Sequence, residues 1–315
     1  MNAVINVYKE KDYTSFDVVA KLRGILRQKK IGHTGTLDPQ AEGVLVVCLG
    51  NATKLCDMLT EKTKEYEAVM RLGVVTDTQD MTGQILKESE VLVTEQQVKD
   101  ALFSMIGPSK QIPPMYSALK VNGKKLYELA REGKEVERKA RDIEIFDINI
   151  KEINLPYVRF VVSCSKGTYV RTICHDIGEK LGCGAAMESL LRTRVERFHL
   201  DSALTLSQIE KLRDENRLEE IMIPVDILFD QYPKVVISND YRKAIDNGNS
   251  VFKEMFFKVE EGDLFYEEGE KIRIYNEDDV FYGVYTYIKA EKRYKPYKMF
   301  LDHEAIQKYG NHNNN

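Results

Sequence analysis

Apolar and polar residues alternate in several parts of the chain and predict strands there. Tyr66, Ala68, Met70 and Leu72 stand at every second position, which is the period of a strand with one buried face. The apolar run within residues 43–49 is unbroken and predicts a strand that is buried on both faces. Further strands are expected at residues 3–8, 143–153 and 157–163.

Amphipathic segments between these strands predict helices. Thr14 and, three residues later, Asp17 form the capping signature of a helix N-terminus. The apolar residues expected to share the buried face of this helix are Phe16, Val19, Leu22 and Leu26. Further helices are predicted at residues 52–64, from Thr94 to near Pro108, at residues 168–180, where Gly182 stops the helix, and at residues 206–218.

The pattern changes at residues 230–233, beyond which the chain is rich in aromatic residues and in strand-like segments. Strands are expected at residues 235–237, 271–275, 281–288 and 298–301, with a tight turn at 276–279. We therefore expect a body over residues 1–229, a β-rich module over residues 230–305 and a disordered tail over residues 306–315. The last hairpin of the module mixes lysines and arginines with Tyr294 and Tyr297, which fits either an RNA-binding surface or a solubilising rim.

Composition narrows the class of protein. The chain has 315 residues and a formal net charge of −4, and this length predicts about two domains. No apolar run approaches the ~20 residues that span a bilayer, and residues 1–3 do not begin a signal peptide. Five cysteines without a CxxC pair suggest neither a disulfide framework nor a zinc site. We therefore expect a cytoplasmic protein that does not enter a membrane.

Charge is segregated along the chain. Residues 1–36 and 108–142 each carry a net charge of +4, whereas residues 201–230 carry −5 and residues 260–279 carry −7. Such segregation would let a basic face bind a polyanion although the total charge is negative. Charge alone favours the simpler interpretation, which is ordinary solvated faces.

The segment at residues 31–43 is the densest in features that bear on chemistry. Its three glycines and Pro39, which restricts the backbone of Asp38, describe a rigid irregular loop between a helix and a buried strand. The loop lacks the signature of a phosphate-binding loop, His33 lacks spaced partners for zinc, and no GxSxG elbow accompanies it. From these residues alone, Asp38 is either a structural turn aspartate or a carboxylate presented for chemistry.

Residues 32–39, with the run GHTGTLDP, closely resemble the signature loop of the TruB family, the bacterial tRNA pseudouridine synthases that act on the T-loop uridine. Five further blocks resemble that family in the same order: KEY at 64–66, TDTQD at 76–80, QIPPMYSALK at 111–120, GKKLY at 123–127 and CSKGTYVRT at 164–172. The resemblance extends from about residue 4 to 229, and the module that follows is similar to the PUA-like RNA-binding domain of these proteins.

The resemblance implies an α+β fold, in which a mixed, mainly antiparallel sheet is flanked by helices and followed by the PUA-like domain. It also implies that the protein isomerises the T-loop uridine (position 55) of tRNA to pseudouridine. Asp38 would then be the nucleophile, at uracil C6 or ribose C1′, on a uridine flipped out of its stack. Arg171 would be its ion-pair partner, and Tyr66 would stack on the uracil and relay the proton that leaves C5.

The resemblance also suggests which residues bind the substrate RNA. They are His33, Tyr169, Leu190, Lys9, Lys120, Lys124 and Lys125. Isomerisation requires no redox change and no added group, so we expect neither a cofactor nor a metal. The expected partner is the T arm of tRNA, with no obligatory protein partner and a monomeric state.

Two departures from the family pattern and two rival functions remain. Glu10 stands where the family usually has proline, and Glu196 where it has glycine. The main rival is a tRNA-binding or tRNA-folding protein in which catalysis is secondary. A glycosidase carboxylate is a weaker rival for Asp38, because those enzymes need a second acid at a defined separation.

Overall fold

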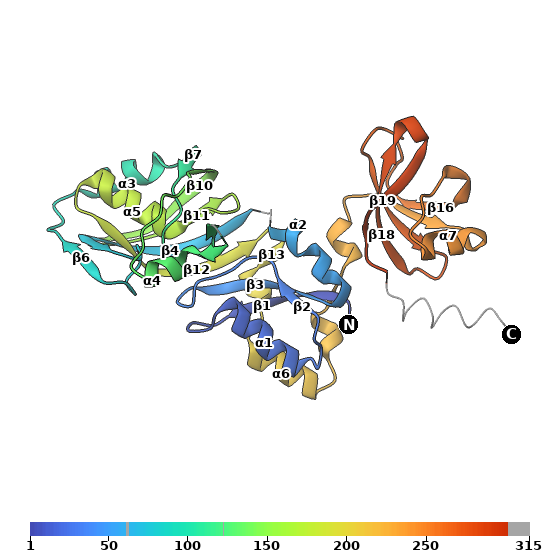
Figure 1. The fold of residues 1–315 in the computed structure, drawn as a ribbon, viewed down its shortest axis with the longest axis horizontal. Coiled ribbons are helices and arrows are strands. Elements are labelled where there is room, and N and C mark those ends of the chain that lie inside the picture. Colours follow the sequence, from blue (N-terminus) through green and yellow to red (C-terminus); the bar gives the residue numbers. More distant parts are fainter. Residues whose placement is uncertain (61–62, 122, 302–315) are drawn as a thin grey trace.

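The computed structural model describes residues 1–60, 63–121 and 123–301, and it forms an elongated molecule with a large sheet at one end and a smaller sheet at the other (Figure 1). The predicted tail at residues 306–315 lies outside the described residues. The predicted α+β class is confirmed, because strands and helices are intermixed and most strand pairs are antiparallel.

The larger sheet has ten strands, eight of them in the order β14-β1-β3-β12-β4-β11-β10-β7, with β2 on β3 and β13 on β12. Its strands are β1 (Ala3–Lys9), β2 (Ile31–His33), β3 (Glu42–Leu49), β4 (Lys64–Leu72), β7 (Gly107–Gln111), β10 (Arg141–Asn154), β11 (Tyr157–Cys164), β12 (Ala185–Val195), β13 (Phe198–His199) and β14 (Ile223–Pro224). Strands β3 and β12 pair in parallel at mid-sheet, whereas the other strand pairs of this sheet, within the described residues, are antiparallel.

Burial explains the two kinds of strand that the sequence predicts. In β3, Val44 and Val46 pack toward one core, while Leu45 and Val47 pack toward another on the opposite face. A strand between two cores must be apolar at every position, which is why its sequence does not alternate. Strand β4 lines a core with one face only, and its buried and partly exposed residues alternate along its whole length, as predicted.

The helices cover the sheet in two groups: α1 and α6 lie together over β1 and β3, and α3 and α5 lie over β4, β10 and β11 (Figure 1). The α-helices are α1 (Ser15–Ile25), α2 (Cys56–Thr60), α3 (Glu95–Phe103), α4 (Leu126–Arg131), α5 (Val170–Leu181), α6 (Leu206–Asp214) and α7 (Arg242–Asp246). The 3₁₀-helices are η1 (Gly50–Leu55), η2 (Leu200–Ser202), η3 (Leu218–Ile221), η4 (Asp226–Phe229), η5 (Asn239–Tyr241), η6 (Lys253–Met255) and η7 (Lys289–Glu291).

The sequence predicted the ends of several helices correctly, but it misplaced one side chain and one whole helix. Thr14 and Thr94 each close a capping box, and Gly182 ends α5 in the left-handed conformation with φ of 77°. Phe16 was wrongly expected on the buried face of α1, because its side chain is 65% exposed. The single helix predicted at residues 52–64 is also wrong: η1 and the short α2 precede β4, which already begins at Lys64.

The smaller sheet has five strands in the order β16-β15-β17-β18-β19. They are β15 (Lys234–Ile237), β16 (Phe256–Glu261), β17 (Lys271–Asn276), β18 (Phe281–Ile288) and β19 (Arg293–Met299). Tyr294 is 1% exposed and donates to Glu270, so it belongs to the core rather than to an RNA-binding surface. Lys295 and Arg293 both pair with Glu291, which neutralises much of the predicted basic hairpin.

Apolar side chains of both sheets meet at their junction. Phe229, Val284 and Phe300 join one buried cluster with residues of β1 and β3. The larger sheet ends at Pro224 and the smaller one begins at Lys234. We propose that the domain boundary lies between these strands, at residues 229/230.

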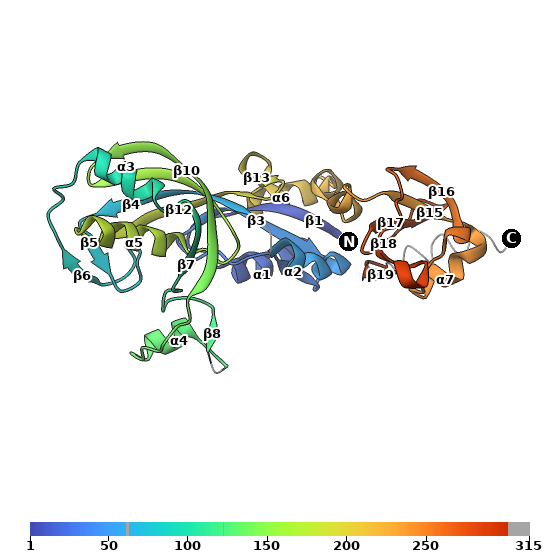
Figure 2. The same ribbon diagram turned by 90° about the horizontal axis from the view of Figure 1, so that it is seen from above.

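Two small hairpins project from the larger sheet. One pairs β5 (Val74–Thr76) with β6 (Ile85–Glu88), and the other pairs β8 (Lys120–Val121) with β9 (Lys124–Lys125), which leads into α4. Figure 2 shows β8 and α4 extending away from the body on one side. Both hairpins contain blocks that resemble the TruB family.

Gly43 provides a test of the parallel junction between β3 and β12. Its φ is +102°, and a Cβ atom there would lie 2.3 Å from the carbonyl oxygen of Arg192. Gly43→Ala should therefore lower the free energy of unfolding by at least about 2 kcal/mol, because strain and overpacking act together. Gly24→Ala in α1 is the matched control: no atom lies within 4 Å of the added carbon, and stability should rise by up to about 1 kcal/mol. Urea denaturation of both variants measures the difference, and equal stabilities would contradict it.

Candidate active site

Asp38 lies in the loop between β2 and β3, which the core anchors on both sides of it. Leu37 and Ala41 are buried in the core cluster beneath α5. The backbone N–H of Leu37 also donates to the Ser15 hydroxyl over 2.9 Å. The Asp38 side chain is 43% exposed. The loop thus buries its neighbours and presents one carboxylate.

Arg171, in the first turn of α5, forms the ion pair expected for Asp38. Its Nη2 atom lies 3.0 Å from the Asp38 Oδ2 atom, although the Arg171 side chain is only 5% exposed. The same guanidinium donates to the carbonyl oxygens of Thr78 over 3.0 Å and Tyr116 over 2.9 Å. It also lies 3.3 Å from the Asp80 carboxylate. Such a set of partners fixes the position of a buried guanidinium and compensates for its burial.

Asp38 and Asp80, whose carboxylates both pair with Arg171, differ in their other hydrogen bonds and in their exposure. Asp80 Oδ1 accepts from the Thr78 hydroxyl over 2.8 Å and from the backbone N–H of Thr82 over 3.0 Å, while Oδ2 faces Arg171. The side chain of Asp38 has Arg171 as its ion-pair partner and is far more exposed than that of Asp80. Asp80 is therefore an anchor, and Asp38 is the carboxylate available to a ligand. Asp80 stands in a block that resembles the TruB family, but nothing in the sequence indicated this contact.

Tyr66 lies on β4, directly opposite Arg192 on β12. Burial raises the pKa of the Tyr66 phenol, and the adjacent Arg192 guanidinium opposes that rise. Burial likewise raises the pKa of the Tyr169 phenol, and the charge of Asp38 acts on both tyrosines. Leu190 lies partly buried on β12, opposite Ala68. Tyr66 also shares one buried cluster with Leu37 and Val170, which are the chain neighbours of Asp38 and Tyr169.

Two buried cations hold the backbone of the Asp38 loop. Lys9 Nζ donates to the carbonyl oxygens of Glu10 over 3.1 Å, Pro39 over 3.2 Å and Ala41 over 2.5 Å. Arg192 Nη2 donates to the carbonyl oxygen of Gly35 over 3.2 Å. Lys9 was expected among the RNA-binding residues, and this is wrong for the structure described, because its side chain is fully buried and its ammonium group is occupied by carbonyl oxygens.

His33 lies partly exposed at the end of β2, next to the loop. Its Nδ1 atom accepts from the backbone N–H of Gly35 over 3.4 Å. Burial lowers the pKa of His33, and the nearby charge of Arg192 lowers it further. The imidazole is thus favoured in its neutral form, which fits contact with a ligand better than a role as an acid.

The three lysines expected to hold RNA lie on the projecting hairpin. Lys120 is exposed on β8. Lys124 pairs with Glu132 over 3.4 Å, and Lys125 Nζ donates to the Tyr127 hydroxyl over 3.2 Å. The three lysines thus lie on an element that extends away from the body of the molecule (Figure 2).

The two departures from the family pattern lie beside strained backbone. Glu196 has a φ of 52° in the turn between β12 and β13, a conformation that glycine adopts more easily. The Glu10 segment leads to Asp12, whose φ is 69° and whose N–H donates to the Pro39 carbonyl oxygen over 2.9 Å. Hydrogen bonds to the Asp38 loop, rather than a proline, stiffen this segment.

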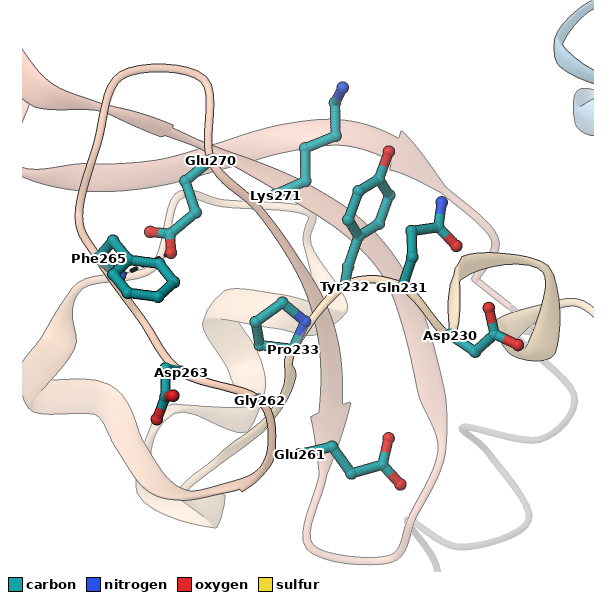
Figure 3. A pocket seen from close by; sticks show the side chains of 10 residues that line it. All are labelled: Asp230, Gln231, Tyr232, Pro233, Glu261, Gly262, Asp263, Phe265, Glu270 and Lys271. Carbon is teal, nitrogen blue, oxygen red and sulfur yellow. Dashed lines mark hydrogen bonds between the residues drawn. The ribbon is translucent and has the colours of Figure 1, made fainter.

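A separate hollow lies on the C-terminal module (Figure 3). Lys271 and Tyr232 extend side by side there, with the ammonium 5.7 Å from the ring centroid. The lining of the hollow contains one lysine and four acidic residues, which are Asp230, Glu261, Asp263 and Glu270. Their negative potential disfavours phosphate, so we assign no RNA contact to this hollow.

Comparison with known proteins identifies the class of protein and then its family. The model for "TruB family pseudouridylate synthase (N terminal domain)" matches residues 23–170, and that for "tRNA pseudouridylate synthase B C-terminal domain" matches residues 171–230. The fold is that of the pseudouridine synthases, as predicted. The chain belongs to the TruB family.

Relatives and solved structures agree with this assignment. A protein of Lachnoclostridium phytofermentans named tRNA pseudouridine synthase B is 52% identical over 96% of this chain and 100% of its own length. The protein of that name from Clostridium tetani is 44% identical over 88% and 93%. A Cbf5-Nop10-Gar1 complex contains a chain that is 28% identical, with a TM-score of 0.70 over 96% of this chain and 86% of that one. An H/ACA RNP bound to a substrate RNA contains one that is 25% identical, with a TM-score of 0.69 over 95% and 85%.

Two features of the described residues bear on membrane and metal binding. No helix among the described residues is long and apolar enough to cross a membrane. Within residues 1–60, 63–121 and 123–301, no three histidine, cysteine, aspartate or glutamate side chains gather as a group that could hold a metal ion.

Lys9 gives a pH test of the loop anchor. Burial lowers its pKa to about 8 from a usual value of 10.5. Between these values the unfolded chain holds a proton that the folded protein has released, so stability rises with pH. The free energy of unfolding of the wild type minus that of Lys9→Met should increase by up to about 3 kcal/mol across this range. Chemical denaturation at pH 7.5, 9 and 10.5 measures it, and a flat or falling difference would show that the ammonium is not desolvated.

Proposed function

We propose that this protein converts the T-loop uridine (position 55) of tRNA to pseudouridine, with Asp38 as the nucleophile on a flipped-out uridine. The observation that carries the proposal is the 3.0 Å ion pair between Asp38 and the buried Arg171. The names of the relatives, tRNA pseudouridine synthase B, support tRNA as the substrate and an isomerase as the kind of enzyme.

The reaction needs few groups, and this site offers them. The bond between uracil N1 and ribose C1′ breaks, the uracil turns, and C5 bonds to C1′, while C5 loses a proton and N1 gains one. A carboxylate that attacks C6 or C1′ can start this sequence. It must be ionised in a partly desolvated site, and an adjacent guanidinium favours the ionised form. Arg171 supplies that charge to Asp38.

Tyr66 and Tyr169 supply aromatic surface beside Asp38. A flipped uracil loses its stacking within the RNA, and an aromatic ring replaces part of that energy. Tyr66 additionally carries a hydroxyl that can relay the proton from C5. His33 and Leu190, at the edges of the same region, complete the surface proposed for the flipped nucleotide.

The exposed lysines of the projecting hairpin fit contact with tRNA phosphates. Lys120 and Lys124 lie on β8 and β9, an element that stands clear of the body (Figure 2). Backbone contacts of this kind recognise the shape of an RNA rather than its sequence. The T arm is a folded element whose shape such a hairpin can hold while the uridine enters the site. We propose the monomer as the active form and the cytoplasm as its location.

Asp38→Asn tests the enzymatic proposal. Tritium release from tRNA labelled at uridine C5 should fall by at least about 1,000-fold, because the amide cannot act as a nucleophile, whereas affinity for tRNA should change by less than about threefold. Asp214→Asn, an exposed aspartate on α6 that pairs with Arg213, is the matched control and should release tritium at the wild-type rate. A wild-type protein that binds tRNA but releases no more tritium than Asp38→Asn would favour the tRNA-binding or tRNA-folding function instead.

Salt dependence tests the lysine contacts. A plot of the logarithm of the tRNA association constant against the logarithm of salt concentration should have a steep negative slope. Lys120→Ala and Lys124→Ala should each reduce that slope by about one. Lys211→Ala on α6, which removes an exposed lysine from the acidic segment, should leave it unchanged. Equal slopes for the hairpin variants and the wild type would remove the hairpin from the binding surface.

A further inference from the structure

Arg192 is, like Lys9, a buried cation beside the Asp38 loop, and the mechanism above does not use it. It lies on β12 with 1% of its surface exposed, opposite both Gly43 on β3 and Tyr66 on β4. Its Nε atom donates to the carbonyl oxygen of Val44 over 2.7 Å, and Nη2 donates to that of Gly35 over 3.2 Å. One guanidinium thus joins the Asp38 loop to β3, on a residue whose backbone pairs with β4.

Within the part of the chain that the structure describes, the charge of Arg192 has no acidic partner. No carboxylate among the described residues lies within 4.0 Å of its guanidinium, in contrast to Arg171, which has two. Burying an unpaired guanidinium is costly, and carbonyl oxygens compensate for its burial only in part. Tyr66 stands directly opposite Arg192 in the ladder between β4 and β12, and its hydroxyl is a neighbouring group that can take up negative charge.

The other charged or titratable groups around this pair do not replace that interaction. Asp38 and Cys164 act on the Tyr66 hydroxyl in the opposite sense to Arg192, because each disfavours negative charge on the phenol oxygen. Lys9 and His33 lie near enough to Arg192 to be affected by its charge, and the Lys9 ammonium is taken up by the carbonyl oxygens of the loop. Arg192 is therefore the cation placed to stabilise a Tyr66 phenolate.

A phenolate is required if Tyr66 relays the proton. The oxygen gives its proton to the uracil at N1 and then takes the proton that leaves C5, whose electron pair returns to the ring. The net change moves one proton from C5 to N1, and no oxidant or reductant takes part. Between the two transfers the oxygen carries a negative charge in a buried site, which a neighbouring cation must stabilise.

We propose that Arg192 is a positioning residue for this reaction: its guanidinium holds Tyr66 against the Asp38 loop and stabilises the phenolate that forms during proton transfer. The inference rests on the proposed function, because it assigns Arg192 a part in the same isomerisation. Lys9 anchors the same loop through Pro39 and Ala41. Stabilising the phenolate is a role that we assign to Arg192 and not to Lys9.

A double-mutant cycle with Tyr66 tests the proposal. Single-turnover tritium release should fall by about 10- to 100-fold in Arg192→Gln, the range expected when a neighbouring cation no longer stabilises the phenolate. In a Tyr66→Phe background the same substitution should change the rate by less than about threefold. Arg192→Lys keeps the charge and should remain within about tenfold of the wild type. Lys9→Met is the control, and its effect should be the same in both backgrounds.

The kinetic isotope effect of deuterium at uridine C5 is a measurement that a purely structural role of Arg192 would leave unchanged. Arg192→Gln should increase the isotope effect on product formation, because loss of the C5 proton becomes slower relative to the other steps. Equal losses in both Tyr66 backgrounds, an unchanged isotope effect, or Arg192→Lys as slow as Arg192→Gln would each overturn the proposal. A wild-type protein that releases no tritium would instead refute the proposed function. If Arg192→Gln does not fold, the rate and isotope effect of Arg192→Lys decide.

Discussion

The ion pair between Asp38 and Arg171 is the interaction on which the rest of the site depends. The Arg171 guanidinium is 5% exposed, and the two carboxylates and the carbonyl oxygens around it compensate for the hydration that it loses. This compensation draws the Asp38 loop, the segment around Asp80 and the carbonyl oxygen of Tyr116 toward the start of α5. These segments are far apart in the sequence, so the buried charge itself determines how the site closes.

The sheet supplies the rigid frame for this pair. The loop that carries Asp38 enters β3 where β3 meets β12 in parallel, and Gly43 lets the two backbones approach closely. Lys9 and Arg192 bind carbonyl oxygens after and before Asp38, respectively. A loop without regular secondary structure is thus held as firmly as a strand, while Asp38 itself stays open to a ligand.

Local pattern predicted those parts of the structure that local physics determines. The alternation in β4, the apolar run of β3 and the capping residues Thr14 and Thr94 each depend on neighbours a few positions away. The parts that were missed depend on distant contacts. Whether Lys9 faces RNA or carbonyl oxygens is decided by how residues 39–41 fold over it. Tyr294 is buried because it packs with Ile272 and Tyr287 of neighbouring strands. No local signal carries that information.

The most direct test is to map pseudouridine in tRNA from a strain in which the gene for this protein is deleted. The account predicts that pseudouridine at position 55 is lost on deletion, returns with the wild-type protein and does not return with Asp38→Asn expressed at the same level. Restoration of the modification by Asp38→Asn, or its persistence in the deletion strain, would contradict the assignment of Asp38 and of the substrate position.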